Sequence, residues 1–257
     1  MIDYRNKRVL ITGAASGIGR GLAQAFAQQG ADLELLDLNG DALDEFSSSL
    51  AGLANVKAVA LDLRSHAAVY AFAQDRQQAP IDVLINNAGV EYPTPLSDTG
   101  AEADERWQAL LNNNVTSMQR LIRALHPSVV DGGSIINQAS VWGLMGVPDF
   151  SSYVASKHAV IGLTRSLAWE LAPRNIRVNA VCPGWTATES AMRSLAAMAQ
   201  KSGRTEHEEL EIILSRQVKP QLLTPGDLAG TYLFLGSALA TPITGQAISV
   251  SYGEMMH

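Results

Sequence analysis

Short apolar runs alternate along the chain with longer segments in which apolar residues recur every three or four positions. The short runs predict strands at residues 9–11, 33–36, 56–61, 83–85, 134–137, 176–181 and 247–250. The longer segments predict helices at residues 19–29, 41–50, 66–77, 101–125, 152–172 and 225–237. Because the strand runs are apolar at consecutive positions, both faces of the sheet should be covered. The pattern therefore predicts an α/β fold, a doubly wound and mostly parallel sheet with helices on both faces.

No linker, internal repeat or low-complexity tract interrupts this alternation, so we expect residues 1–257 to form a single domain. The helix expected at 152–172 is apolar nearly all round, although a helix that covers a sheet needs only one apolar face. The second apolar face favours a contact between subunits over deep burial within one large domain.

The charge balance narrows the choice of partners. The 257 residues include 19 Lys and Arg against 25 Asp and Glu, and the basic residues are scattered. The net charge of −6 argues against nucleic acid or an anionic membrane surface as a partner, and we expect a small-molecule substrate. Cys182 is the only cysteine, which fits a reducing cytosol. Because no apolar stretch resembles a membrane span or a signal peptide, we expect a soluble cytoplasmic protein.

A glycine-rich turn connects the first predicted strand to the first predicted helix. Its sequence from Thr12 to Gly19 is T-G-A-A-S-G-I-G. Glycines there let the backbone approach a pyrophosphate closely, and the N–H groups that begin the helix can bind it. The spacing differs from the usual G-x-G-x-x-G fingerprint, but its place between strand and helix indicates a dinucleotide site.

An acidic residue, Asp37, ends the second predicted strand. A carboxylate there can accept hydrogen bonds from the adenosine ribose hydroxyls and would repel a 2′-phosphate. No Lys or Arg occupies 14–16 or 38–39, where a cation would be wanted for NADP. These residues favour NAD as the cofactor, although an Asp before Asn-Gly can also serve only to form a turn.

Three residues in the second half of the chain are candidates for proton transfer. Tyr153 and Lys157 are four residues apart on a predicted helix, so their side chains project from one face. A neighbouring ammonium favours the phenolate and lowers the pKa of a tyrosine toward the working pH. Ser140 places a hydroxyl at the end of the preceding buried strand. Such a pair is common in helices, and only its combination with the glycine turn and Ser140 makes it informative.

Taken together, these motifs resemble the classical short-chain dehydrogenase/reductase family over nearly the whole chain. The matching residues are the turn at 12–19, Asp37, Asp62, Asn86-Asn87-Ala88-Gly89, Ser140, Tyr153-x-x-x-Lys157 and Pro183-Gly184. The resemblance implies a Rossmann-type sheet of seven mostly parallel strands. It also implies an NAD-dependent oxidoreductase that acts on CH–OH groups, similar to alcohol and polyol dehydrogenases and to 3-oxoacyl reductases. Members of the family are commonly tetramers, so we expect a homotetramer or a homodimer.

The resemblance also implies roles for individual residues. Tyr153 would be the general acid/base on the substrate oxygen, and Lys157 would lower its pKa and hold the nicotinamide ribose. Ser140 would donate a hydrogen bond to the same substrate oxygen. Asn114 would hold a water that links Lys157 to solvent, although Asn112 and Asn113 precede it and only register separates the three.

The same resemblance implies an extended set of cofactor contacts. These are Gly13, Ser16, Gly17, Ile18, Gly19, Asp37, Leu38, Asp62, Leu63, Asn87, Ala88, Gly89, Tyr153, Lys157, Pro183, Gly184, Thr186 and Thr188.

Residues 186–217 correspond to the family's variable substrate-binding excursion. Further substrate contacts are expected from Glu91, Trp142, Met145, Asp149 and Trp185. Aromatic surface combined with two carboxylates suits a polyol or sugar or an aryl carbinol, and a 3-hydroxyacyl compound stays open as well. The charged run at 206–209 should form a solvated helix face, and we expect no metal site there.

Two alternatives bear on function and assembly. A catalytically silent nucleotide-binding scaffold on the same fold would be expected to lack Ser140, Tyr153 or Lys157, and all three are present. At the carboxyl end, His257 could reach the substrate region of a partner chain, or the tail could simply fray.

Overall fold

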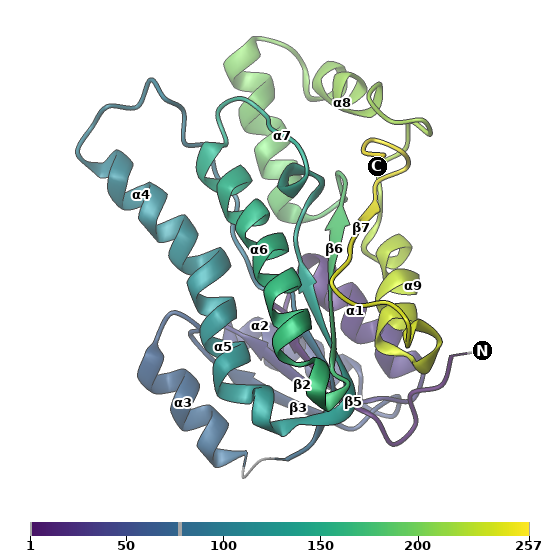
Figure 1. Ribbon diagram of the computed structural model, residues 1–257. Coiled ribbons are helices and arrows are strands. Elements are labelled where there is room, and N and C mark those ends of the chain that lie inside the picture. The colour runs from purple at the N-terminus through teal and green to yellow at the C-terminus, as the bar shows by residue number, and fades with distance from the viewer. Residues whose placement is uncertain (1, 77–78, 257) are drawn as a thin grey trace.

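The computed structural model describes residues 2–76 and 79–256, and its centre is a seven-stranded sheet (Figure 1). The strands lie in the order β3-β2-β1-β4-β5-β6-β7, and every adjacent pair is parallel. Their bounds are β1 Arg8–Thr12, β2 Asp32–Asp37, β3 Val56–Ala60, β4 Ile81–Asn86, β5 Val129–Gln138, β6 Arg177–Pro183 and β7 Ala247–Val250. The predicted doubly wound sheet is confirmed, and it is parallel throughout.

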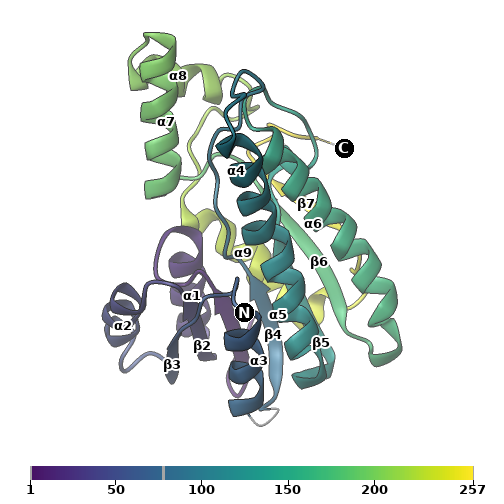
Figure 2. The same cartoon turned by 90° about the vertical axis from the view of Figure 1, so that its left-hand side faces the viewer.

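Helices cover both faces of the sheet (Figure 2). They are α1 Gly17–Gln28, α2 Gly40–Ser49, α3 His66–Asp75, α4 Glu102–Leu111, α5 Ser117–Leu125, α6 Ser151–Glu170, α7 Glu189–Ser202, α8 Glu206–Leu214 and α9 Pro225–Gly236. Buried side chains of α1, α2 and α9 pack on one face, and those of α3, α5 and α6 pack on the other.

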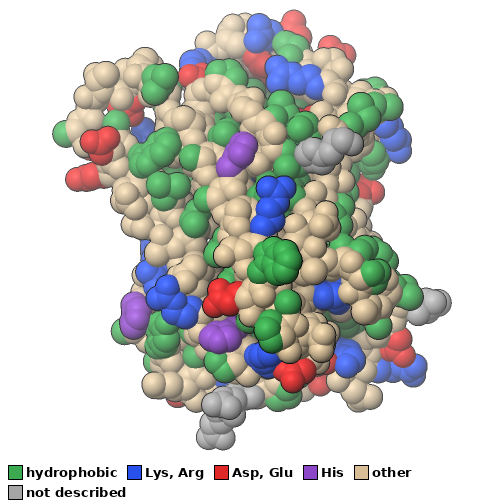
Figure 3. Space-filling view, viewed as in Figure 1, with side chains coloured by type: hydrophobic (Ala, Val, Ile, Leu, Met, Phe, Trp, Pro, Cys, Tyr) green, Lys and Arg blue, Asp and Glu red, His purple; other side chains and the backbone are tan. Residues whose placement is uncertain are grey.

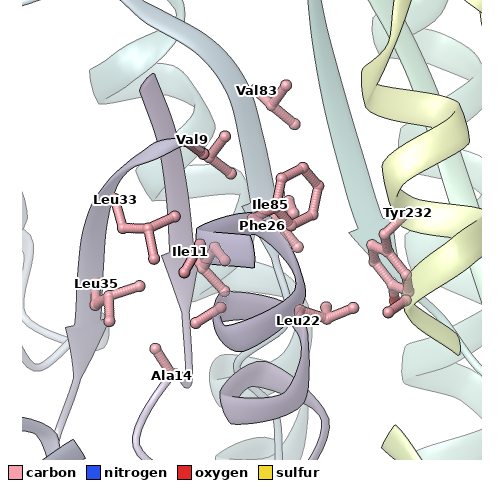
Figure 4. Packing of buried hydrophobic residues seen from close by; sticks show 14 of the residues in the cluster. Val9, Ile11, Ala14, Leu22, Phe26, Leu33, Leu35, Val83, Ile85 and Tyr232 are labelled. Carbon is pink, nitrogen blue, oxygen red and sulfur yellow. The ribbon is translucent and has the colours of Figure 1, made fainter. Parts of the chain in front are cut away.

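Alternate residues of the inner strands enter the two apolar layers. In β1, Val9 and Ile11 pack with α1 and α9, whereas Leu10 packs on the opposite side with α5 and α6. Phe26 of α1 and Tyr232 of α9 fill the first layer beside the strands (Figure 4). Each inner strand contributes side chains to both apolar layers, which is why its sequence is apolar at consecutive positions.

The long helix expected at 101–125 is interrupted in the structure. It consists of α4, a π-helical segment at Asn112–Thr116, and α5. Asn114 lies in this segment, where its side chain bonds to both backbone polar groups of Val90. A π-helical turn inserts extra backbone where a tertiary contact demands it, so the prediction of one regular helix was wrong at this point.

Two other differences concern element ends. Strand β5 begins at Val129, five residues before the predicted start, and its pairing with β4 shifts register between Ile81 and Val83. Helix α3 ends at Asp75, and the predicted end at residue 77 lies outside the described residues, as does His257.

The excursion at 186–217 contains α7 and α8, which lie beyond the carboxyl ends of the strands (Figure 1). In the charged run, Glu209 is buried against Arg204 at 2.9 Å, so the expected solvated face applies only to its neighbours. Acidic and basic side chains are interspersed on the face seen in Figure 3. Within the described part of the chain, no helix combines the length and apolar character needed to cross a membrane.

Candidate active site

The glycine turn between β1 and α1 is held closed by the end of β4. Asn87 donates side-chain hydrogen bonds to the carbonyl oxygens of Thr12 (2.9 Å) and Gly13 (3.1 Å). A Cβ added at Gly19 would overlap the Gly13 carbonyl oxygen, and Gly13 itself has a φ of +65°. Only glycine fits these positions, and the bare backbone is what a pyrophosphate can approach.

Asp37 at the end of β2 supports the same turn. Its carboxylate accepts hydrogen bonds from the backbone N–H groups of Ala15 (3.0 Å) and Asn39 (2.9 Å). A carboxylate offers about four acceptor positions, so two remain for ribose hydroxyls. The turn-forming role and the predicted ribose role are therefore compatible.

The turn opens into a cavity of about 370 Å³ at the carboxyl ends of β1, β2, β3 and β4. Its walls include all the predicted adenosine and pyrophosphate residues except Gly19, namely Gly13, Ser16, Gly17, Ile18, Asp37, Leu38, Asp62, Leu63, Asn87, Ala88 and Gly89. Gly19 lies just behind, where its missing side chain gives room to the turn. The glycine cradle and this open volume fit the adenosine half of a dinucleotide.

Two cations line this cavity that sequence reasoning missed. Arg64 forms an ion pair with Asp62 at 2.9 Å, and that hydrogen bond lowers the pKa of the Asp62 carboxyl. Arg193 reaches the cavity from α7. The proximity of Arg64 to Asp62 in sequence was the available signal, whereas nothing local to Arg193 indicates that α7 folds over this site.

Lys157 is buried on α6 and is held by the end of β5. Its Nζ donates to the carbonyl oxygen of Gln138 at 3.0 Å and lies 5.5 Å from the centre of the Tyr153 ring. Burial lowers the pKa of Lys157 to about 8, against the partial opposition of Glu91. The helix places the two predicted side chains together, as their four-residue spacing required.

The pKa of Tyr153 moves in the direction opposite to that expected. Burial raises it well above the ordinary tyrosine value, the charge of Glu91 raises it further, and a hydrogen bond from Ser140 opposes both. In this structure, desolvation of the phenolate outweighs any help from the lysine. Tyr153 is therefore held as a neutral phenol, which can donate its proton.

Ser140 follows the end of β5, directly before the short helical turn at Val141–Gly143, and lies beside the tyrosine. The backbone N–H of Trp142 donates to its Oγ at 3.2 Å, which fixes the hydroxyl oxygen and leaves its proton for another acceptor. Trp142 packs edge-on against Tyr153, with ring centres 5.8 Å apart. The short helical turn at Val141–Gly143 thus positions both the serine and the tyrosine.

Asn114 is fully buried, and both of its amide N–H groups and one acceptor position of its oxygen bond to protein partners. It accepts from the Val90 N–H (2.8 Å) and donates to the Val90 carbonyl (2.8 Å) and to Ser156 Oγ (3.1 Å). Its side chain therefore ties the π-helical segment to the chain after β4. The Asn114 oxygen keeps one acceptor position, and the predicted water relay stays a prediction.

A second cavity, of about 160 Å³, adjoins the first and holds the proton-transfer residues. It is lined by Ser140, Tyr153 and Lys157, by the predicted substrate residues Glu91, Trp142 and Trp185, and by Pro183, Gly184, Thr186 and Thr188. The two cavities share walls at Ile18, Asn87, Gly89, Val90, Gln138, Thr188 and Ser190. The two cavities are therefore neighbours, one at the glycine turn and the other at the tyrosine.

Two predicted substrate residues lie elsewhere. Asp149 is exposed, has a φ of +66° and pairs with Lys201 of α7 at 2.6 Å, so it does not line the cavity. Met145 packs behind Trp142 and Phe150 in a small apolar cluster. Neither residue lines the cavity, so the structure does not place them as substrate contacts. The described residues contain no group of three potential metal ligands.

The loop after β6 is backed by a residue that sequence reasoning missed. A Cβ added at Gly184 would come within 3.0 Å of Glu254 Oε2 and 2.9 Å of the Ser251 side chain. Burial raises the pKa of Glu254, and its Oε2 is buried without a hydrogen-bond partner among the described residues. The carboxyl-terminal segment therefore supports the Pro183–Gly184 loop within the same chain.

Comparisons with known proteins agree with this geometry. Residues 13–254 match the family model described as enoyl-(acyl carrier protein) reductase. A D-beta-hydroxybutyrate dehydrogenase of Cupriavidus necator is 34% identical over 247 residues, which cover 93% of this chain and 94% of the relative.

Solved structures extend the comparison. L-sorbose reductase from Gluconobacter frateurii, complexed with NADPH and L-sorbose, superposes with a TM-score of 0.90 at 29% identity, covering 100% of this chain and 98% of that one. A 3-oxoacyl-[acyl-carrier protein] reductase with bound NAD from Brucella melitensis gives a TM-score of 0.85 at 31% identity, covering 99% and 93%. The fold, the match along the whole chain and the residues at the strand ends place this chain in the short-chain dehydrogenase/reductase family, as the sequence motifs predicted.

Proposed function

We propose that this protein is an NAD-dependent dehydrogenase that interconverts secondary alcohols and ketones. The observation that carries the proposal is that Ser140, Tyr153 and Lys157 line one cavity, and that this cavity adjoins the glycine-turn cavity and shares wall residues with it. A reacting carbon beside Tyr153 would then lie next to the cavity that suits the dinucleotide.

The residues of the chain supply orientation and proton transfer. The bound nicotinamide supplies the hydride-accepting carbon for oxidation, and the hydride donor for reduction. Tyr153 takes the hydroxyl proton as the alcohol is oxidised, or donates its proton to the carbonyl oxygen in reduction. Ser140 donates a hydrogen bond to the same oxygen and stabilises charge that develops there. Lys157, held by Gln138, places a positive charge near the phenol.

The preference for NAD rests on Asp37. Its carboxylate lies in the cavity wall beside the exposed side chain of Leu38, and a 2′-phosphate there would meet negative charge. One of the two solved relatives carries NADPH and the other NAD, so membership of the family does not by itself indicate which cofactor this chain prefers. We expect kcat/KM to be at least about tenfold higher with NAD than with NADP, and equal values would refute the role of Asp37.

The decisive experiment is NADH formation with a panel of polyols, hydroxy acids and aryl carbinols. Turnover with secondary alcohols supports the proposal, whereas measurable NAD binding without any turnover favours a silent scaffold. Tyr153→Phe should lower turnover by roughly a hundredfold or more while cofactor binding persists. Tyr70→Phe, on α3 and outside both cavities, is the matched control and should retain activity.

We also propose assembly through the outer face of α6. Trp169 on this helix is 86% exposed, although its neighbours on the other side are packed in the core. A large exposed aromatic side chain on an apolar helix is typical of a subunit contact. Trp169→Glu should shift the molecular mass measured by light scattering toward the monomer, and an unchanged mass would exclude this face.

A further inference from the structure

A carboxylate lies in the cavity that holds the three candidate catalytic residues. Glu91 follows β4 and lines the same cavity as Tyr153 and Lys157. The hydroxyl of Ser194 on α7 donates to its Oε1 at 3.1 Å. Among residues 2–76 and 79–256, no other hydrogen bond to this carboxylate is present. The carboxylate therefore has acceptor capacity left for a bound molecule.

The charges in this cavity are few. Of its lining residues, only Lys157 is basic and only Glu91 is acidic. The lysine already donates to the Gln138 carbonyl and lies against the tyrosine ring. An anionic substrate would consequently find no second cation among these walls, and it would face a carboxylate in a poorly solvated space. Like charges brought together in such surroundings repel strongly.

The remaining walls suit a neutral molecule with an apolar side. The indoles of Trp142 and Trp185 meet edge to face, with centres 6.3 Å apart, and together form an aromatic surface beside the tyrosine. Aromatic faces pack against the C–H groups of a small molecule, while a few fixed polar groups set its orientation. The two indoles offer no hydrogen-bond acceptor for a substrate hydroxyl, and the Glu91 carboxylate in the same cavity supplies one.

We propose that Glu91 determines substrate charge: it accepts a hydrogen bond from a second hydroxyl of a neutral polyol or sugar and excludes hydroxy acids. The inference rests on the proposed dehydrogenase function and names its substrate class. Ser194 orients the carboxylate from α7, and so makes the excursion part of the selection.

Three substrates with the same reacting carbon test the proposal: butane-1,3-diol, butan-2-ol and 3-hydroxybutyrate. For the natural chain, kcat/KM should decrease in that order. Glu91→Gln keeps the size of the side chain but removes its charge, and should shift the ratio of diol to hydroxybutyrate by roughly tenfold or more toward the acid. Ratios between substrates cancel any general effect of Glu91 on Tyr153. Ser194→Ala retains the charge and should still discriminate against the acid.

Binding without turnover separates this inference from the dehydrogenase proposal. Calorimetric titration of 3-hydroxybutyrate in the presence of saturating NADH should show tighter binding to Glu91→Gln than to the natural chain. If no secondary alcohol is oxidised but this tightening is found, the dehydrogenase proposal is refuted and the role of Glu91 in charge selection stands. If neither the affinity nor the substrate ratio changes by more than about twofold, well short of the expected repulsion, the role of Glu91 is refuted.

Discussion

Replacing Lys157 by Met should change how stability depends on pH. The lysine side chain is 3% exposed, and burial lowers its pKa from 10.5 to about 8. A difference of about 2.5 pKa units corresponds to roughly 3 kcal/mol at about 1.4 kcal/mol per unit. The folded protein carries this cost whenever Lys157 must be charged, and methionine removes it.

The sign follows from where protons are bound. Well below pH 8, the lysine is protonated in both states and the full cost applies. Between pH 8 and 10.5 the unfolded lysine still holds its proton while the folded one has lost it, so the free energy of unfolding rises with pH. Relative to Lys157→Met, the natural chain should therefore gain roughly 2 to 3 kcal/mol between pH 7 and pH 10.

Urea unfolding of the cofactor-free protein at those two pH values, at one protein concentration, measures this gain. The hydrogen bond from Lys157 to Gln138 and the packing of the methionine add a constant offset, but they do not depend on pH. Lys57→Met is the control because that side chain is 61% exposed, and its stability difference should be nearly the same at both pH values. A change below about 0.5 kcal/mol for Lys157→Met would refute the reasoning from burial.

Two further substitutions test the turn and the core. Gly19→Ala should weaken NADH binding by roughly tenfold or more, as measured by NADH fluorescence, because the new Cβ would overlap the turn and come within 2.6 Å of Asn87 Nδ2. The control is Gly230→Ala on α9, where a Cβ meets open space, and this variant should bind NADH as the natural chain does. Arg76→Met should lower the free energy of unfolding by about 3 to 5 kcal/mol, because it leaves the buried Glu34 with only the exposed Lys57, at 3.4 Å, as a charged partner. A loss below about 1 kcal/mol, the value expected for an exposed ion pair, would contradict that account.

The strands and the location of the site could be predicted because both follow from local pattern. Apolar residues at consecutive positions indicate burial on two faces, and parallel strands bring their carboxyl ends to one edge. Asp37 and Asn87 each end or follow a strand, so their convergence on the glycine turn required only the topology. The same logic placed Tyr153 and Lys157 on one helix face.

What could not be predicted depends on partners far away in the sequence. The π-helical segment exists because Asn114 reaches Val90, 24 residues earlier, and no local pattern reports that contact. Glu91 and Asp149 looked equivalent as loop carboxylates near the site. Lys201, 52 residues beyond Asp149, draws that side chain to the surface, whereas Ser194 holds Glu91 at the cavity. Both partners lie on α7, so the position of this helix determines which of the two carboxylates lines the cavity.

The direction of the Tyr153 pKa gives the site a definite resting state. A lysine four residues away was expected to favour the phenolate, but burial, with the charge of Glu91 added to it, raises the pKa of Tyr153 well above the ordinary value. The protein alone therefore keeps the proton on Tyr153, ready for donation to a carbonyl. Acceptance of a proton from an alcohol needs further positive charge beside the phenol, which an oxidised nicotinamide carries. Glu91 raises the pKa of Tyr153 and, as proposed above, also limits the charge of the substrate. Substrate selectivity and proton transfer therefore depend on the same carboxylate.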